Sequence, residues 1–314
     1  MLITRRAAIT VTLAAPFVAR RAYAATTIRV GTLKTISALP PYFYERFAPE
    51  GVKFEVIPFD SPTDGKDALV SGTVDYGCFG IAAAILGAAA RQPVAVIASV
   101  CGKGMAIVAG KDSGITTLAD LKGRKVAILP GTTQEIFTME RLRMEGMSIR
   151  DITAVRVPFS EMHAALARGD VDAYVGAEPG PAISVSSGIG RVVEYPYSTE
   201  MGWLNVILAA NRDNFAKYPG QAKMVVGLQR QVSLLSRSDP AAIAAMGLAK
   251  LGLNKAVFDL ALPNVDIDWE MTPRMIQEAK TYAEYMLSLK QIRALPDFAL
   301  CIDPSFSQQV AGAA

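Results

Sequence analysis

Two similar segments decide the fold: residues 68–75 read ALVSGTVD and residues 165–172 read ALARGDVD. Each predicts a helix that ends at a glycine, a tight turn, and the start of a short buried strand. A strand that ends in Pro-Phe precedes both segments, at Pro58-Phe59 and at Pro158-Phe159. Because the flanking elements repeat in the same order, the sequence indicates two lobes built on one β-α-β plan.

Short apolar strands alternate with helical stretches from Ile28 to about residue 210. This alternation predicts an α/β fold, with mainly parallel sheets covered by helices on both faces. The last third of the chain has no further copy of the repeated unit and is expected to form helices that pack around the first lobe. We predict a first lobe of residues 25–105 plus 205–314 and a second lobe of residues 106–204, with chain crossings near Gly104 and Trp203.

The first 24 residues are typical of a cleaved signal segment. A basic start at Arg5-Arg6 is followed by an apolar stretch and by the small-residue pattern Ala22-Tyr23-Ala24. Thr4-Arg5-Arg6 is similar to a twin-arginine start, although Ala8 replaces the usual aromatic residue, so both export routes stay open. A membrane anchor is the alternative, but the apolar run is short for a span and contains Pro16. We therefore expect an exported, periplasmic protein.

Composition limits the classes of partner. The 314 residues are 51% hydrophobic and 19% charged, which is enough to bury a large core. The net charge of +3 is misleading, because the first 24 residues carry four arginines and no acid. The remaining chain is close to neutral, so charge gives no support for nucleic acid or an anionic membrane as a partner.

The cysteines and the single histidine fit no metal motif, and no metal or cofactor is expected. Cys78 and Cys101 both lie near predicted strand ends and could pair in an oxidising compartment. Three unpaired, buried thiols are the equally weighted alternative. His163 follows a helix start and is expected to be a surface or capping residue.

Three stretches carry recognisable motifs: residues 117–127 read TLADLKGRKVA, residues 131–133 read GTT, and GDVDA at residues 169–173 precedes Glu178-Pro179. These motifs resemble those of substrate-binding proteins of ABC importers. Thr117 also predicts the start of a capped helix. The resemblance points to the NMT1/THI5-like group of nitrate, sulfonate, taurine and thiamine-pyrimidine binders. It implies a type II periplasmic-binding fold, in which two lobes joined by a two-strand hinge close around a solute.

Candidate ligand-binding residues lie in loops at the carboxyl ends of the predicted strands, where open parallel sheets bind their ligands. They are Thr32, Lys34, Thr35, Ser61, Thr63, Phe79, Gly80, Gly131, Thr132, Thr133, Gln134, Glu178 and Trp203.

The Gly131-Thr132-Thr133 turn is the strongest candidate. Its glycine lets a ligand approach the backbone, and hydroxyl and N–H groups at a helix start suit an anion or a carbonyl oxygen. The alternative is a simple helix cap worth about 1 kcal/mol. Ser61 and Thr63 have the same chemistry and the same alternative.

The remaining candidates have equally plain alternatives. Lys34 could pair with an acid, although most loop lysines are only solvated, and Glu178 could bind an amine or serve the hinge. Phe79 and Trp203 could stack on a planar ligand, but aromatic side chains are more often core. Asp75 and Asp172, at equivalent strand starts, are expected to bind backbone donors.

We therefore expect a non-enzymatic, monomeric protein that captures a small solute and passes it to the permease of an ABC importer. One alternative is an exported ligand sensor for a receptor. Another is an enzyme similar to the thiamine-pyrimidine synthases, which the resemblance associates with a pyridoxal-phosphate lysine, a histidine and a cysteine-rich motif. Only Cys78-Phe79 is similar to that motif. The sequence leaves the identity of the solute open.

Overall fold

The computed structural model of this chain describes residues 26–215, 217–218 and 220–312. The predicted signal segment, residues 1–24, lies outside the described residues. Within them, no single helix is long and apolar enough to cross a membrane. The bent pair Pro240–Leu251 and Lys255–Asn264 meets that test of length and composition only when both helices are counted together.

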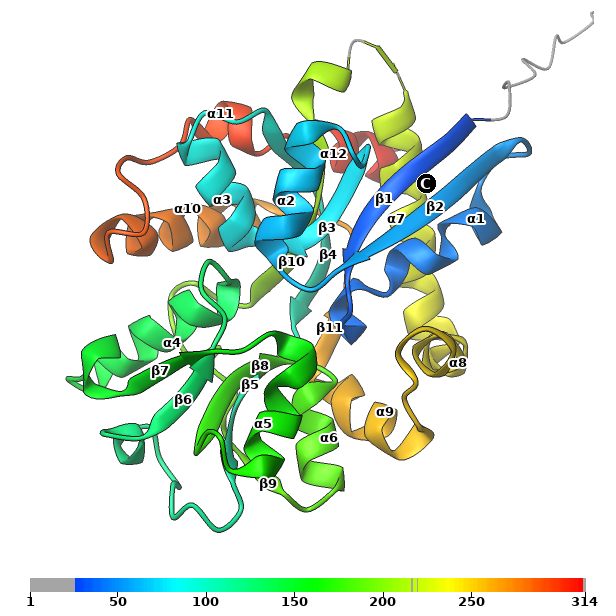
Figure 1. The fold of residues 1–314 in the computed structure, drawn as a ribbon. Helices are drawn as coiled ribbons and strands as arrows, with labels where there is room; N and C mark the ends of the chain where they lie inside the picture. Colours follow the sequence, from blue (N-terminus) through cyan, green and yellow to red (C-terminus); the bar gives the residue numbers. More distant parts are fainter. Residues whose placement is uncertain (1–25, 216, 219, 313–314) are drawn as a thin grey trace, which may run out of the picture.

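Two sheets lie in two lobes, with the first sheet above the second in Figure 1. The first sheet has the order β11-β4-β10-β3-β1-β2, and the second has the order β7-β6-β8-β5-β9. The strands of the first are β1 (Thr26–Leu33), β2 (Val52–Phe59), β3 (Tyr76–Gly80), β4 (Val94–Lys103), β10 (Leu204–Asn211) and β11 (Val265–Ile267). The strands of the second are β5 (Met105–Gly110), β6 (Lys125–Ile128), β7 (Thr153–Arg156), β8 (Ala173–Ala177) and β9 (Gly190–Glu194).

The two sheets repeat one plan, as the two eight-residue segments predict. The order β4-β10-β3-β1-β2 corresponds to β9-β5-β8-β6-β7, and β10 and β5 are the antiparallel strands at matching places. Asp75 accepts a hydrogen bond from the Arg29 N–H of β1, and Asp172 accepts one from the Lys125 N–H of β6, both at 2.8 Å. The expectation that these aspartates bind backbone donors is confirmed.

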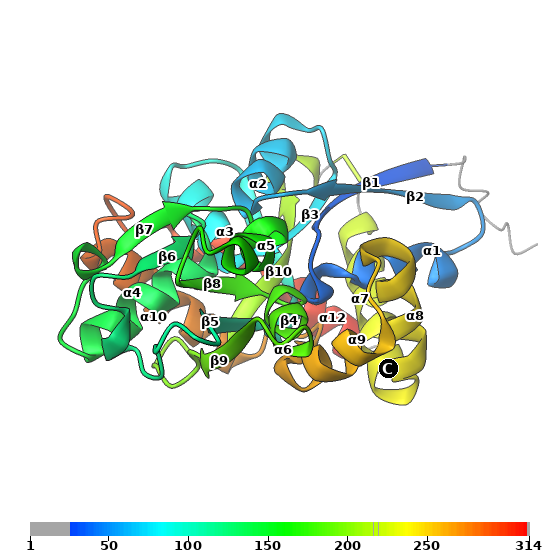
Figure 2. The same cartoon turned by 60° about the horizontal axis from the view of Figure 1, so that its bottom comes forward.

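Helices cover both faces of the sheets. Those of the repeated units are α1 (Tyr44–Phe47), α2 (Pro62–Ser71), α3 (Ile81–Ala89), α4 (Thr133–Met144), α5 (Met162–Arg168) and α6 (Gly180–Ser186). Those after β10 are α7 (Gln221–Ser238), α8 (Pro240–Leu251), α9 (Lys255–Ala261), α10 (Pro273–Ser288), α11 (Phe298–Cys301) and α12 (Ser305–Ala311). Figure 2 shows α7, α8 and α9 beside the first sheet, with α9 against α6 of the second lobe.

The core follows the period of the strands. Along β5, Ala106 and Val108 belong to one buried cluster, and Ile107 and Ala109 belong to another on the opposite face. This alternation is what a strand with helices on both faces requires. In the first lobe the helices after β10 join the same core as the sheet, for example through Val225 of α7.

Local predictions fail at two places. The stretch at Thr117 does not begin a capped helix but leads into a short 3₁₀ turn, Ala119–Leu121. The Asp120 carboxylate closes this turn, because it accepts hydrogen bonds from the N–H and hydroxyl groups of both Thr116 and Thr117. These hydrogen bonds hold the pKa of Asp120 well below its usual range. The second miss is β11, whose three residues pair antiparallel with β4 and give too short a pattern to detect.

The cysteines are free and buried, which is the unpaired alternative. Cys78 lies opposite Leu208, and Cys101 lies opposite Val206, on the two sides of β10. Two strand spacings separate β3 from β4, about 10 Å, and a disulfide needs Cα atoms closer than about 7 Å. The suggested pairing of Cys78 with Cys101 is therefore wrong.

Candidate functional site

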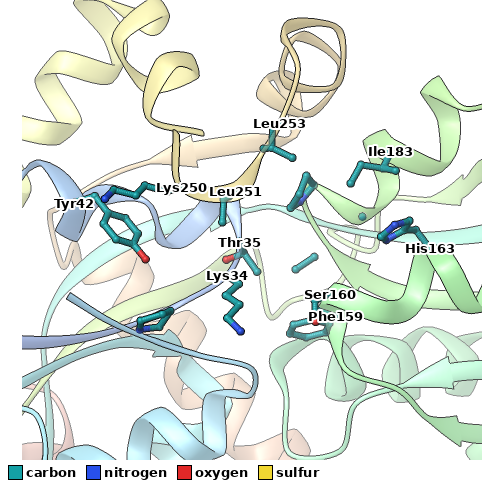
Figure 3. A pocket seen from close by; sticks show the side chains of 14 residues that line it. Lys34, Thr35, Tyr42, Phe159, Ser160, His163, Ile183, Lys250, Leu251 and Leu253 are labelled. Atoms are coloured by element: carbon teal, nitrogen blue, oxygen red, sulfur yellow. The ribbon is translucent and has the colours of Figure 1, made fainter. Parts of the chain in front are cut away.

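A cavity of about 320 Å³ lies between the two lobes (Figure 3). Its walls come from the loop after β1, the start of α5, the loop between β8 and α6, and the turn after α8. The lining residues are Lys34, Thr35, Tyr42, Pro58, Phe159, Ser160, His163, Ala177, Pro179, Gly180, Ile183, Lys250, Leu251 and Leu253.

Strand ends and one helix end place these side chains. Loops that follow β1 and β8 face each other because both sheets direct the carboxyl ends of their parallel strands toward the gap between the lobes. Helix α8 ends at Gly252, whose φ of 68° lies in the left-handed region that favours glycine. The turn brings Leu251 and Leu253 to the cavity wall.

A smaller cavity of about 10 Å³, room for one water-sized group, adjoins the inner end of the first. The two cavities share Thr35, Phe159 and Ala177. The first turns of three helices line the small cavity, through Pro62 of α2, Gly80 at the N-cap of α3, and Gln134 of α4. The free N–H groups and the positive dipole ends of these helices favour an anion there.

Three buried hydroxyls lie at this inner end, those of Thr35, Ser37 and Thr133; Thr35 and Thr133 have no hydrogen-bond partner, and Ser37 has only the Cys101 thiol beside it. Their residues are only 3%, 1% and 0% exposed. Thr35 and Ser37 line the small cavity, and Thr133 lies so close to Gly80 that a Cβ at Gly80 would be 2.5 Å from its Oγ1. Buried polar atoms are nearly always hydrogen-bonded, so the Thr35 and Thr133 hydroxyls are available to a bound polar group.

The outer cavity carries positive charge and no carboxylate among its lining residues. Lys34 pairs with Asp60 at 2.8 Å, and the ammonium of Lys250 lies 5.1 Å from the ring centroid of Tyr42. Burial raises the pKa of Tyr42, and the charge of Lys34 opposes that effect. Burial lowers the pKa of His163 from its ordinary 6.5 and so favours the neutral ring.

The chain crosses between the lobes at a hydrogen-bonded hinge. Glu178 accepts hydrogen bonds from Asn264 Nδ2 at 3.1 Å and from the Ala182 N–H at 3.2 Å. Its backbone N–H donates to the carbonyl of Gly104, the residue between β4 and β5. The Tyr197 hydroxyl accepts from the Met105 N–H at 2.7 Å, and its single proton lies within reach of two acceptors, the Met105 carbonyl and Asn264 Oδ1, so it ties the second crossing to the first.

The structure brings some predicted site residues to the cavities. Lys34 and Thr35 line the outer one, and Thr35, Gly80 and Gln134 line the inner one. Thr133 lies beside them. Gly131 and Thr63 face each other across the lobes, since a Cβ at Gly131 would lie 3.2 Å from Thr63 Oγ1.

Other candidates are engaged elsewhere. Thr132 caps α4, accepting from the Glu135 N–H and donating to the Leu129 carbonyl, and Ser61 caps α2 through the Asp64 N–H. The Thr32 hydroxyl donates to the Ala38 carbonyl. Each of these three hydroxyls makes a hydrogen bond within the protein, whereas those of Thr35 and Thr133 do not.

The two aromatic candidates and Glu178 also lie outside the cavity linings. Phe79 is fully buried, with its ring against Gly65 and Gly77, so it packs the core instead of meeting a ligand. The ring of Trp203 lies 3.8 Å from the guanidinium carbon of Arg274, on the hinge side. Glu178 serves the hinge, which was its alternative role.

Sequence reasoning missed Ser37, Ser160, Lys250, Leu251 and Leu253, and it set His163 aside as a surface or capping residue, whereas His163 lines the cavity. Gly252 is a local signal for the end of α8, but only the tertiary packing of α8 shows that this end faces the cavity.

Two α/β lobes, two crossings and a cavity at the facing strand ends define the class of bilobal binding-protein folds. A family model described as NMT1/THI5 like matches residues 45–226, and the chain belongs to this family. The structure of the alkanesulfonate-binding protein SsuA from Xanthomonas axonopodis pv. citri, bound to MOPS, superposes on this chain with a TM-score of 0.79 at 22% sequence identity. The aligned part covers 88% of this chain and 98% of the SsuA chain. The predicted family and fold class are confirmed.

Relatives in sequence include both a binding protein and an enzyme. A 4-amino-5-hydroxymethyl-2-methylpyrimidine phosphate synthase of Aspergillus parasiticus is 25% identical over 249 residues, which is 71% of this chain and 72% of that protein. A putative aliphatic sulfonates-binding protein of Escherichia coli (strain K12) is 28% identical over 166 residues, 52% of each chain.

Proposed function

We propose that this protein captures a small organic acid between its lobes and delivers it to an ABC import permease. The observation that carries the proposal is the pair of unpartnered, buried hydroxyls, those of Thr35 and Thr133, where the first turns of α2, α3 and α4 meet. Neutral donors and helix N-termini bind anions well without burying a counter-charge. The relatives described as sulfonate-binding proteins support the same chemistry.

Both lobes contribute to this inner site, which suits a protein that closes on its ligand. Thr35 and Ser37 follow β1 of the first lobe, and Thr133 and Gln134 open α4 of the second. A ligand held by both sets stabilises the closed form by contacts that the open form lacks. The Tyr282 hydroxyl of α10 donates to the Thr133 carbonyl at 2.6 Å and adds a direct bond between the lobes.

Transport further requires export, and we infer a monomeric, periplasmic protein on the strength of the signal-like first 24 residues and of its exported relatives. A solute-sensing role for a receptor would use the same closure. The proposal includes no nucleic-acid partner and no cofactor.

Catalysis of the pyrimidine-synthase kind has less support from the residues. The cysteine that is similar to that family's motif, Cys78, is fully buried in β3. Burial raises the pKa of its thiol to about 12, so it is a protonated core group and presents no thiolate to the cavity.

Thr133→Val tests the proposal, because valine keeps the shape and removes only the free hydroxyl. We expect affinity for the best-binding acid, selected by thermal shift from sulfonates and carboxylates, to fall about 10- to 100-fold, as for loss of a hydrogen bond to a charged group. Stability should stay the same or rise, since no protein hydrogen bond is lost.

Thr138→Val is the matched control on the same helix. The Thr138 hydroxyl is buried and donates to the Gln134 carbonyl at 2.8 Å, so its loss should change affinity little. Calorimetry and chemical denaturation of both variants separate the two effects. Unchanged affinity in Thr133→Val would remove the inner site from the proposal.

A further inference from the structure

The outer end of the cavity has a different character from the inner end. The inner end is lined by buried hydroxyl and amide groups, whereas two lysines, Lys34 and Lys250, stand at the outer end. The Lys34 side chain is 45% exposed and Lys250 is also exposed, which places both ammonium groups toward solvent. Figure 3 shows both lysines with Tyr42 on one wall and His163 on the opposite wall.

The charge of Lys250 is not compensated. Lys34 pairs with Asp60, but Lys250 makes no ion pair with any residue in the described ranges, and its ammonium contacts only the face of the Tyr42 ring at 5.1 Å. No acidic residue lines the cavity. An ammonium over an aromatic ring still has free N–H donors, so it can bind an anion that reaches the outer end.

Apolar side chains also line the cavity. They are Phe159, Leu251 and Leu253, together with Pro58 and Ile183. The cavity thus combines a donor-rich inner end, apolar walls and a cationic outer end. Its volume of about 320 Å³ is at the small end of the range for ligand pockets, so one compact molecule would span all three.

We propose that the outer end is a second anion subsite and that the solute is a two-headed acid: one acidic group at the inner hydroxyls, an apolar body, and a second acidic group at Lys250 and Lys34. This inference rests on the proposed function, since it extends the ligand of the same cavity. Lys250 is the specificity-determining residue, because Lys34 already shares its charge with Asp60.

Calorimetry with matched probe pairs tests the subsite. Each pair has a one-headed and a two-headed acid of the same body: benzenesulfonate with 4-sulfobenzoate, and benzoate with terephthalate. We expect the two-headed member to bind about 5- to 10-fold more tightly at low ionic strength. The preference should shrink as salt is added, because the outer subsite is exposed.

Lys250→Gln removes the free charge and keeps an unbranched polar side chain that is one atom shorter. It should abolish the preference for the two-headed probe and leave the affinity for the one-headed probe within about twofold. The matched control is Lys255→Gln, which changes an exposed lysine on α9 that pairs with Asp259 and does not line this cavity. It should keep the preference. Lys34→Gln is less informative, because it would also leave Asp60 without its ion-pair partner.

The outcomes separate the two proposals. If one-headed probes bind and two-headed probes bind no more tightly, the outer subsite is overturned and the proposed function stands. A preference that survives in Lys250→Gln also overturns the role of Lys250. If no probe of either pair binds, capture of organic acids and the outer subsite both fail.

Discussion

Glu178 makes the stability of this protein depend on pH in an unusual direction. The residue is 1% exposed, and in the described part of the chain no basic side chain pairs with it. Burial raises the pKa of its carboxyl from 4.5 to about 7, although the hydrogen bonds from Asn264 and from the Ala182 N–H oppose this effect. Desolvation therefore outweighs two hydrogen bonds at the hinge.

The magnitude follows from linkage between protonation and folding. Between pH 4.5 and pH 7 the folded chain retains the Glu178 proton that the unfolded chain has lost, so the free energy of unfolding falls as pH rises. The total change contributed by this one carboxyl is about 3 kcal/mol, at about 1.4 kcal/mol per pH unit. Above pH 7 both states are ionised, and the contribution is constant.

Glu178→Gln removes this titration, because glutamine is neutral at every pH. We expect the free energy of unfolding of the variant, minus that of the original protein, to rise by about 3 kcal/mol from pH 4.5 to pH 8. For a chain of this size that corresponds to about 6 °C in melting temperature. Chemical denaturation at four or five pH values measures it, and taking the difference cancels the titration of distant groups.

The control for this series is Glu50→Gln, which makes the same substitution at an exposed glutamate. A flat difference for Glu178→Gln would refute the argument. A difference that falls as pH rises would mean that the hydrogen bonds of Asn264 and Ala182 dominate over burial and hold the carboxyl ionised.

Two further predictions concern contacts between the lobes. Gly80→Ala should weaken ligand binding at least tenfold in calorimetry. The extended backbone at Gly80 accepts alanine, but the new Cβ would lie 2.5 Å from Thr133 Oγ1. Unchanged affinity would mean that Thr133 moves aside without consequence. Tyr282→Phe should lower the free energy of unfolding by about 1–2 kcal/mol and also weaken binding, because it leaves the buried Thr133 carbonyl without its hydrogen bond to α10. Denaturation and calorimetry on one preparation check both effects. A loss of stability with full affinity would show that this hydrogen bond does not favour closure.

Sequence reasoning succeeded where a signal is local and repeated. Asp75 and Asp172 could be assigned to backbone donors because each follows the same glycine turn and precedes the same kind of strand. The two-lobed fold followed from that repeat, and the limits of the lobes stay a prediction. The three residues of β11 gave no comparable pattern, because their pairing partner β4 is about 160 positions earlier in the chain.

The site was predictable only in part, because the use of a hydroxyl depends on its surroundings. Thr132 and Thr133 are adjacent and chemically identical, and the sequence could not tell which one caps α4. The structure assigns the cap to Thr132 and leaves the Thr133 hydroxyl unpartnered. Lys250 was missed for a related reason: it lies on a helix more than 200 residues from the β1 loop that it joins at the cavity.

The repeat also accounts for the position of the inner site. Strands β1 and β6 occupy equivalent places in the two sheets, so the loops that follow them are equivalent as well. Thr35 comes from the first of these loops and Thr133 follows the second, and both keep a buried hydroxyl without a partner. A fold duplicated in this way places one such hydroxyl on each lobe. An acidic group bound there would contact both lobes at once, and this is the condition under which ligand binding favours closure.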